Sequence, residues 1–201
     1  MKSLDTMKTL MAAGALAVSA GAVSASTLTP IAGSSCSTDP TSFVIGSEPA
    51  FSMPCEGIFD GNPSNTINAN TEAFGITGWM EIVKVDDAAP SPATKNGITL
   101  TVNVLGDTHG TWSVSEWPSF PYIMVALKGG PTFSLFKIDP SKGLSGTWDT
   151  ASLQTGGGDL EPGLSNVTVW AAIPLPAAGW LLLAGLGALG AAARRQRRKA
   201  A

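Results

Sequence analysis

The stretch Ile98-Thr99-Leu100-Thr101-Val102-Asn103-Val104 alternates apolar and polar side chains along its whole length. A β-strand needs this period of two when one of its faces is buried and the other meets water. Nowhere between residues 26 and 171 do apolar residues recur with the sustained 3.6-residue period of an amphipathic helix. The stretch therefore predicts a half-buried strand, and it favours an all-β fold for the segment around it.

Other stretches of the same segment also have strand patterns. The apolar runs at residues 122–128 and 133–138 flank Gly129-Gly130, and because two glycines suit a primed turn, they predict a β-hairpin. Further strands are expected at residues 43–46, 75–85, 111–115, 146–150 and 164–170. Short strands separated by turns rich in Gly, Pro, Asp and Asn predict a single antiparallel β-sandwich domain, jelly-roll-like, over residues 26–171.

The charges are distributed unevenly over the 201 residues, a length that suits one sizeable domain. Between residues 26 and 172, five lysines stand against 14 acidic residues, which gives a net charge of −9. So acidic a domain argues against nucleic acid as a partner, since binding to phosphates needs a basic face. A charged fraction of 13%, with 23 Gly and 14 Pro, also disfavours a helical bundle.

The N-terminus has the features of an export signal. Two lysines precede an apolar stretch at residues 10–18, and small residues ending in Ala25 follow it. This order predicts a signal peptide over residues 1–25, cleaved between Ala25 and Ser26, with cleavage after Ala20 as the alternative. A retained amphipathic or membrane-spanning helix fits less well, because the stretch is short and rich in Ala and Gly. The rest of the chain is therefore expected to fold outside the cytoplasm.

Cys36 and Cys55 are the two cysteines of the chain. In an exported protein this pair predicts one disulfide, worth about 3 kcal/mol from loop-closure entropy. Two unpaired buried thiols are the alternative. A metal site fits less well, because two cysteines and the distant His109 do not supply four ligands at the spacing of a zinc site. No metal ligand and no cofactor is predicted.

The C-terminus combines three features without a spacer. The motif Ile173-Pro174-Leu175-Pro176-Ala177 comes first, and its prolines favour the extended backbone that a protease or transpeptidase can grip. Residues 177–193 carry no charge and predict one transmembrane helix, about 25 Å long. A basic cluster ends the segment, made of Arg194, Arg195, Arg197, Arg198 and Lys199. Since positive residues stay on the cytoplasmic side, the acidic domain is expected to face outward.

These features make residues 172–201 resemble the VPLPA-CTERM form of the PEP-CTERM sorting signal, with Ile173 in place of Val. The resemblance implies that exosortase is a partner. Exosortase is an integral-membrane, cysteine transpeptidase-like enzyme of Gram-negative bacteria that make exopolysaccharide. The resemblance also implies that the protein is held at the inner membrane as a sorting intermediate. Its expected destination is then the cell surface or the extracellular matrix.

The domain is also similar to extracellular domains found ahead of such tails. The similar pieces are Cys55-Glu56-Gly57, Asp60-Gly61-Asn62, Gly78-Trp79, Gly110-Thr111-Trp112-Ser113, residues 125–130, Gly146-Thr147-Trp148 and residues 163–166. Asn166 stands where the usual ending has His. These domains have no established catalytic role, so the resemblance transfers none to this chain.

Possible catalytic and metal sites have little support in the sequence. A nucleophilic triad would need His109, a serine and an acid such as Asp107, and no catalytic residue is predicted because nothing brings such a set together. Asp60-Gly61-Asn62 could begin a calcium loop. However, Asn65 stands where an EF-hand needs Gly, and Glu72 comes one place too late. A capped turn is the alternative there.

Tryptophan suggests a different kind of site. Trp79, Trp112, Trp117, Trp148 and Trp170 lie in predicted strands or at their ends, where core packing is the commoner use. Trp117 is followed by Pro118 and is the best candidate for an exposed platform that stacks on a sugar ring.

Three functional hypotheses result. The first is a non-enzymatic exported surface or matrix protein sorted by exosortase. The second is a module that binds exopolysaccharide at the cell surface, and the third is an ordinary single-pass membrane-anchored protein. A secreted hydrolase ranks below all three.

Overall fold

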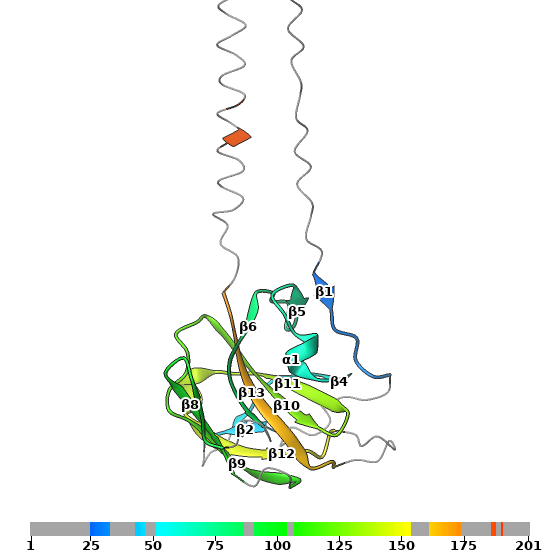
Figure 1. Cartoon of the computed structure of the whole chain (residues 1–201), viewed down its shortest axis with the longest axis vertical. Helices are drawn as coiled ribbons and strands as arrows, with labels where there is room; N and C mark the ends of the chain where they lie inside the picture. The colour runs from blue at the N-terminus through cyan, green and yellow to red at the C-terminus, as the bar shows by residue number, and fades with distance from the viewer. Residues whose placement is uncertain are drawn as a thin grey trace, which may run out of the picture.

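The computed structural model describes residues 25–32, 43–46, 51–86, 91–103, 107–153, 161–173, 186–187 and 190. This part of the chain is mostly β-strand in antiparallel sheets with very little helix (Figure 1). In chain order the elements are β1 (Ser26–Thr27), β2 (Phe43–Ile45), β3 (Phe51–Ser52), β4 (Cys55–Asp60), α1 (Pro63–Thr66), β5 (Thr71–Glu72), β6 (Trp79–Asp86), β7 (Ala93–Lys95), β8 (Ile98–Val102), β9 (His109–Val114), β10 (Tyr122–Gly129), β11 (Thr132–Lys137), the 3-10 helix η2 (Pro140–Lys142), β12 (Ser145–Asp149) and β13 (Leu164–Ala172). The all-β prediction is confirmed.

Two larger sheets face each other across one core. The five-stranded sheet has the order β4-β11-β10-β13-β6, and the six-stranded sheet has the order β3-β2-β12-β9-β8-β7. In β8, Ile98, Leu100 and Val102 are buried whereas the threonines between them are half-buried, so the predicted alternation is observed. Val104, at the end of the predicted strand, lies outside the described residues.

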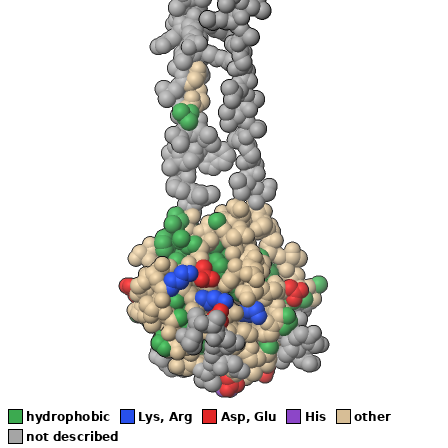
Figure 2. Space-filling view, viewed as in Figure 1, with side chains coloured by type: hydrophobic (Ala, Val, Ile, Leu, Met, Phe, Trp, Pro, Cys, Tyr) green, Lys and Arg blue, Asp and Glu red, His purple; other side chains and the backbone are tan. Residues whose placement is uncertain are grey.

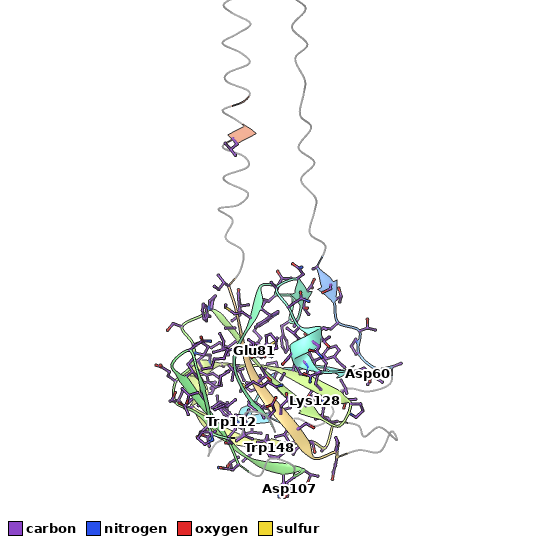
Figure 3. The ribbon with its side chains drawn as sticks, in the orientation of Figure 1. Asp60, Glu81, Asp107, Trp112, Lys128 and Trp148 are labelled. Atoms are coloured by element: carbon purple, nitrogen blue, oxygen red, sulfur yellow. The ribbon has the colours of Figure 1, made fainter. Side chains whose placement is uncertain are left out.

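The core between the sheets, called the inner core below, draws apolar side chains from both. Its members are Phe43, Ile45, Met53, Ile82, Val83, Val85, Ile98, Leu100, Val102, Trp112, Val114, Ile123, Val125, Leu127, Phe136, Ile138, Trp148, Leu164, Val167, Val169 and Ala171. Figure 3 labels Trp112 and Trp148, which are only 2% and 1% exposed. Their burial agrees with the expectation that most tryptophans serve packing.

The opposite face of the five-stranded sheet carries a second cluster, the outer core. Along β10, alternate side chains go to the two clusters, since Ile123 and Val125 belong to the inner core and Met124 and Ala126 to the outer core. The buried outer core consists of Phe59, Ile67, Ala73, Trp79, Met124, Ala126, Phe133, Leu135, Trp170 and Ala172. Residues near the N-terminal end of the described chain and in the loop after α1 pack against it, among them Leu28 and Phe74.

Some details differ from the sequence prediction. The predicted hairpin is present, but Gly129 pairs with Thr132, so the turn residues are Gly130, at φ 56°, and Pro131. The strand expected from residue 75 begins at Trp79, because Ala73 and Ile76 form a bridge that closes a tight turn with positive φ at Phe74 and Gly75. Outside the two larger sheets, β1 runs parallel to β5 in a separate two-stranded sheet.

Candidate functional site

The sorting segment begins inside the folded domain. Ala172 is the last residue of β13 and is fully buried, with Tyr122 of β10 and Trp79 of β6 as its neighbours in the ladder. Ile173 follows directly and is 47% exposed. A Cβ atom placed on Gly78 would lie 2.5 Å from the carbonyl oxygen of Ile173. The backbone at the start of the motif therefore packs closely against the beginning of β6.

Most of the remaining predicted signal lies outside the described residues. This applies to Pro174, Leu175, Pro176 and Ala177 and to the basic cluster from Arg194 to Lys199. Within residues 177–193, the structure describes only residues 186–187 and 190, and Leu186 is 58% exposed. No helix in the described part of the chain is long and apolar enough to cross a bilayer.

The N-terminal end of the domain lies at the predicted signal-peptidase site. Ser26 donates its backbone N–H to the carbonyl oxygen of Asn70 at 2.8 Å, and it is the first residue of β1. Ala25, just before it, is exposed, and residues 1–24 lie outside the described residues. Cleavage between Ala25 and Ser26 stays a prediction. It would produce a chain that begins with its first paired strand residue.

Both ends of the domain emerge on the same side (Figure 1). The chain between β5 and β6 connects them, because β5 pairs with β1 and Trp79 at the start of β6 pairs with Ala172. The signals predicted at the two termini are thus attached to one side of the domain.

Cys55 opens β4, and it is not a free thiol. Its predicted partner Cys36 lies outside the described residues, so their pairing stays a prediction.

Trp117 differs from the other tryptophans of the domain. Trp79, Trp112, Trp148 and Trp170 are at most 3% exposed, whereas Trp117 is partly exposed. Its indole N–H donates to the carbonyl oxygen of Gly143 at 2.7 Å, and its ring packs against Trp112 with centroids 5.7 Å apart. These contacts fix the orientation of the ring while leaving part of it accessible.

Trp117 also forms part of the wall of a cavity of about 450 Å³. The lining comes from β6, from the turn that leads into β8 and from the loop after β9. It consists of Met80, Ile82, Asn96, Ile98, Glu116, Trp117, Pro118, Ser119 and Phe120. The cavity thus joins aromatic rings to an amide, a carboxylate and a hydroxyl. The sequence analysis named Trp117 alone and missed the other lining residues, although Ser119 and Phe120 follow Trp117 closely in the chain.

In the other candidate sites, the polar side chains form hydrogen bonds with residues close to them in the chain. The Asp107 carboxylate accepts from the N–H of Thr108 at 2.8 Å, and Nδ1 of His109 lies 3.4 Å from the Thr108 hydroxyl. Asp107 lies at the end of the domain opposite β1 (Figures 1 and 3). In the region proposed for calcium, the Asn62 side chain caps α1 by accepting from the N–H of Ser64 at 3.1 Å. Among the described residues, no three His, Cys, Asp or Glu side chains form a group that could hold a metal ion.

Lysines gather on the outer face of the five-stranded sheet (Figure 2). By ladder position Lys84, Lys128 and Lys137 share this face, and Lys84 forms an ion pair with Asp86. Partial burial, together with the nearby charge of Lys84, lowers the pKa of Lys128 below its usual value. By the same ladders Glu56, Glu81 and Asp86 also lie on this face, so it carries charges of both signs.

One comparison with known proteins agrees with the predicted PEP-CTERM sorting signal. Residues 172–198 match the PEP-CTERM protein-sorting motif. This motif implies an exported protein that is sorted and processed by exosortase and is anchored transiently at the membrane. Neither the curated proteins nor the solved structures include a match to the chain. Of the matched residues, Ala172 and Ile173 belong to the folded part described above.

Proposed function

We propose that this chain is a non-enzymatic protein of the cell surface or extracellular matrix, sorted by exosortase through the VPLPA form of the signal. In this proposal the domain is a jelly-roll-like β-sandwich with a disulfide between Cys36 and Cys55. A signal peptide over residues 1–25 precedes it. A transmembrane helix over residues 177–193 holds the sorting intermediate in the inner membrane.

The observation that carries the proposal is the sorting motif at residues 172–198, joined directly to a folded β-domain. Strand β13 ends at the first residue of the motif, and a proline favours an extended backbone in the residue before it, which suits recognition by a processing enzyme. The exposed carboxylate of Asp107 and the ring of His109 contact Thr108 rather than each other. Their geometry adds no argument for a hydrolase.

The proposal is tested by replacing Pro174 and Pro176 together with alanine in cells that contain exosortase. The expected result is that the unprocessed protein accumulates in the inner membrane and that the surface fraction falls about tenfold or more, since both rigid residues of the motif are lost. Pro140→Ala is the control, because Pro140 is exposed and lies in η2 outside the motif. Normal surface delivery of the double variant would contradict the proposal.

A second candidate function is binding of exopolysaccharide at the cavity beside Trp117. It is supported by a partly exposed indole of fixed orientation that lies among an amide, a carboxylate and a hydroxyl. Sugars use such a combination, since their C–H faces stack on rings and their hydroxyls bind polar groups. Trp117→Ala is expected to weaken binding to the producer's own polysaccharide about tenfold, while Trp117→Phe retains most of it. Equal binding by Trp117→Ala and the wild type would contradict this function.

A further inference from the structure

The position of the motif limits how a processing enzyme can reach it. Ala172 is fully buried between β10 and β6, so the folded domain extends to the first residue of the matched motif. Pro174 is two residues further along the chain and thus at most about 7 Å away. An enzyme that binds the motif must therefore approach the end of the folded domain as well.

That end of the domain exposes two apolar side chains, one in β6 and one in the residue that follows β13. Met80 of β6 is paired with Ala171 of β13, and Ile173 lies two residues beyond Ala171. Because side chains two apart on a strand share a face, Met80 and Ile173 are diagonal neighbours on the same face. They are 44% and 47% exposed. Met80 also lines the cavity beside Trp117, so this apolar surface extends from the motif toward the six-stranded sheet.

We propose that Met80 and Ile173 form a docking surface for exosortase, used when the enzyme binds the sorting motif. The proposal rests on the proposed function and adds to it a contact outside the motif. Exosortase is the partner because this surface is continuous with the motif: Ile173 belongs to the matched motif, and Met80 of β6 is its diagonal neighbour. Exposed apolar side chains grouped in this way are typical of interaction sites. The folded domain is then part of what the enzyme recognises.

The test measures how fast the tail is removed in cells that contain exosortase. Met80→Gln is expected to slow processing about fivefold, because a half-exposed apolar side chain loses its burial in the complex. Met80→Leu is expected to keep the normal rate. The matched control is Leu144→Gln, since Leu144 is also 44% exposed but lies just before β12 in the other sheet. Thermal unfolding of the purified variants shows that they are folded.

Several results would overturn the inference. These are a normal rate for Met80→Gln, equal slowing by Leu144→Gln, or equal slowing by Met80→Leu. A photo-crosslinking residue at position 80 is expected to give an adduct with exosortase, and adducts with lipid alone would also overturn it. If the wild-type tail is retained even when exosortase is present, the proposed function fails, which is a different outcome from a failure of docking at Met80.

Discussion

The two faces of the five-stranded sheet bury similar side chains but hold different parts of the molecule. The inner face packs against the six-stranded sheet, whose Phe43 and Trp112 stack with ring centroids 4.8 Å apart. The outer face packs against the segment around Leu28 and the loop after α1, and it includes Trp79 and Ala172. The inner core therefore makes the two sheets one domain. The outer core fixes the position from which the sorting segment leaves.

The largest expected effects come from removing one buried ring from each core. Phe43 and Phe133 are 1% and 0% exposed. Each change to alanine is expected to lower the free energy of unfolding by about 3–5 kcal/mol, measured by urea unfolding. Phe43→Ala is expected to lower it more than Phe133→Ala. The Phe43 ring stacks on those of Trp112 and Phe136, with centroids 4.8 and 5.3 Å apart.

These two variants are expected to differ in local opening. The Phe133 ring packs against that of Phe59 in the outer core, with centroids 5.3 Å apart. Phe133→Ala should therefore raise the rate of amide hydrogen exchange at Leu28 and around β5 by more than the loss of global stability explains. Equal exchange there in both variants, after correction for global stability, would show that the two cores act as one unit.

A smaller effect is expected where the chain just before β6 meets the motif. Gly78 and Gly75 both have positive φ, 89° and 70°, but a Cβ on Gly75 would meet open space whereas one on Gly78 would meet Ile173. Gly75→Ala is expected to lower the free energy of unfolding by about 1 kcal/mol, because alanine is strained at this positive φ. Gly78→Ala is expected to cost about 2–3 kcal/mol, since Ile173 must also move. Equal thermal unfolding of the two variants would mean that Ile173 is not held against β6.

A pKa change is expected on the polar part of the outer face. Burial is the main cause that lowers the pKa of Lys128, and the charge of Lys84 adds to it. Lys84→Gln is therefore expected to raise the pKa of Lys128 partway toward its ordinary value, as followed by NMR titration of its side chain. Lys142→Gln is the control and should leave that pKa unchanged. No change in Lys84→Gln would mean that the two ammonium groups do not interact.

The same shift predicts how stability depends on pH. Because the pKa of Lys128 is lower in the folded state than in the unfolded state, the folded protein releases this proton first. The contribution of Lys128 to the free energy of unfolding should therefore rise with pH between its folded pKa and the ordinary 10.5. Lys84→Gln should narrow this pH interval, because it raises the pKa of Lys128 in the folded state.

The smallest effect is expected at Ser134, whose buried hydroxyl has no hydrogen-bond partner within the described part of the chain. Ser134→Ala is expected to change the free energy of unfolding by less than about 1 kcal/mol or to raise it, since no bond is lost. Thr71→Val is the contrasting variant, because the Thr71 hydroxyl accepts from the N–H of Asn68 at 3.0 Å and donates to the carbonyl oxygen of Thr66 at 3.2 Å. A loss at Ser134 as large as that at Thr71 would contradict this account.

The strands that could be predicted are those whose burial alternates locally, as at residues 98–102, or whose turn is marked by glycine. Among the elements that carried no such signal are β4 and α1. β4 contains Gly57 at positive φ and an irregular register with β11, so its pairing depends on a distant strand. α1 has only four residues, too few for a period to show, although Asn62-Pro63 is a typical helix start.

The candidate site could be predicted only where its residues are consecutive in the sequence. The sorting motif is a continuous string, and its residues identified it directly. Gly78 and Met80 acquire their importance from Ile173, which lies more than 90 positions away in the chain and becomes a neighbour only through the ladder between β6 and β13. The cavity beside Trp117 likewise combines three separate segments. No local sequence pattern indicates that these distant residues are neighbours in the fold.

The central claim is that exosortase removes the tail from this exported domain, and the most direct test is the intact mass of the protein from surface and membrane fractions. The measurement compares cells with and without exosortase. The account predicts a chain that ends near Pro176 or Ala177 only when exosortase is present. Retention of residues 194–201 in both strains would contradict it, and the protein would then be an ordinary single-pass membrane-anchored protein.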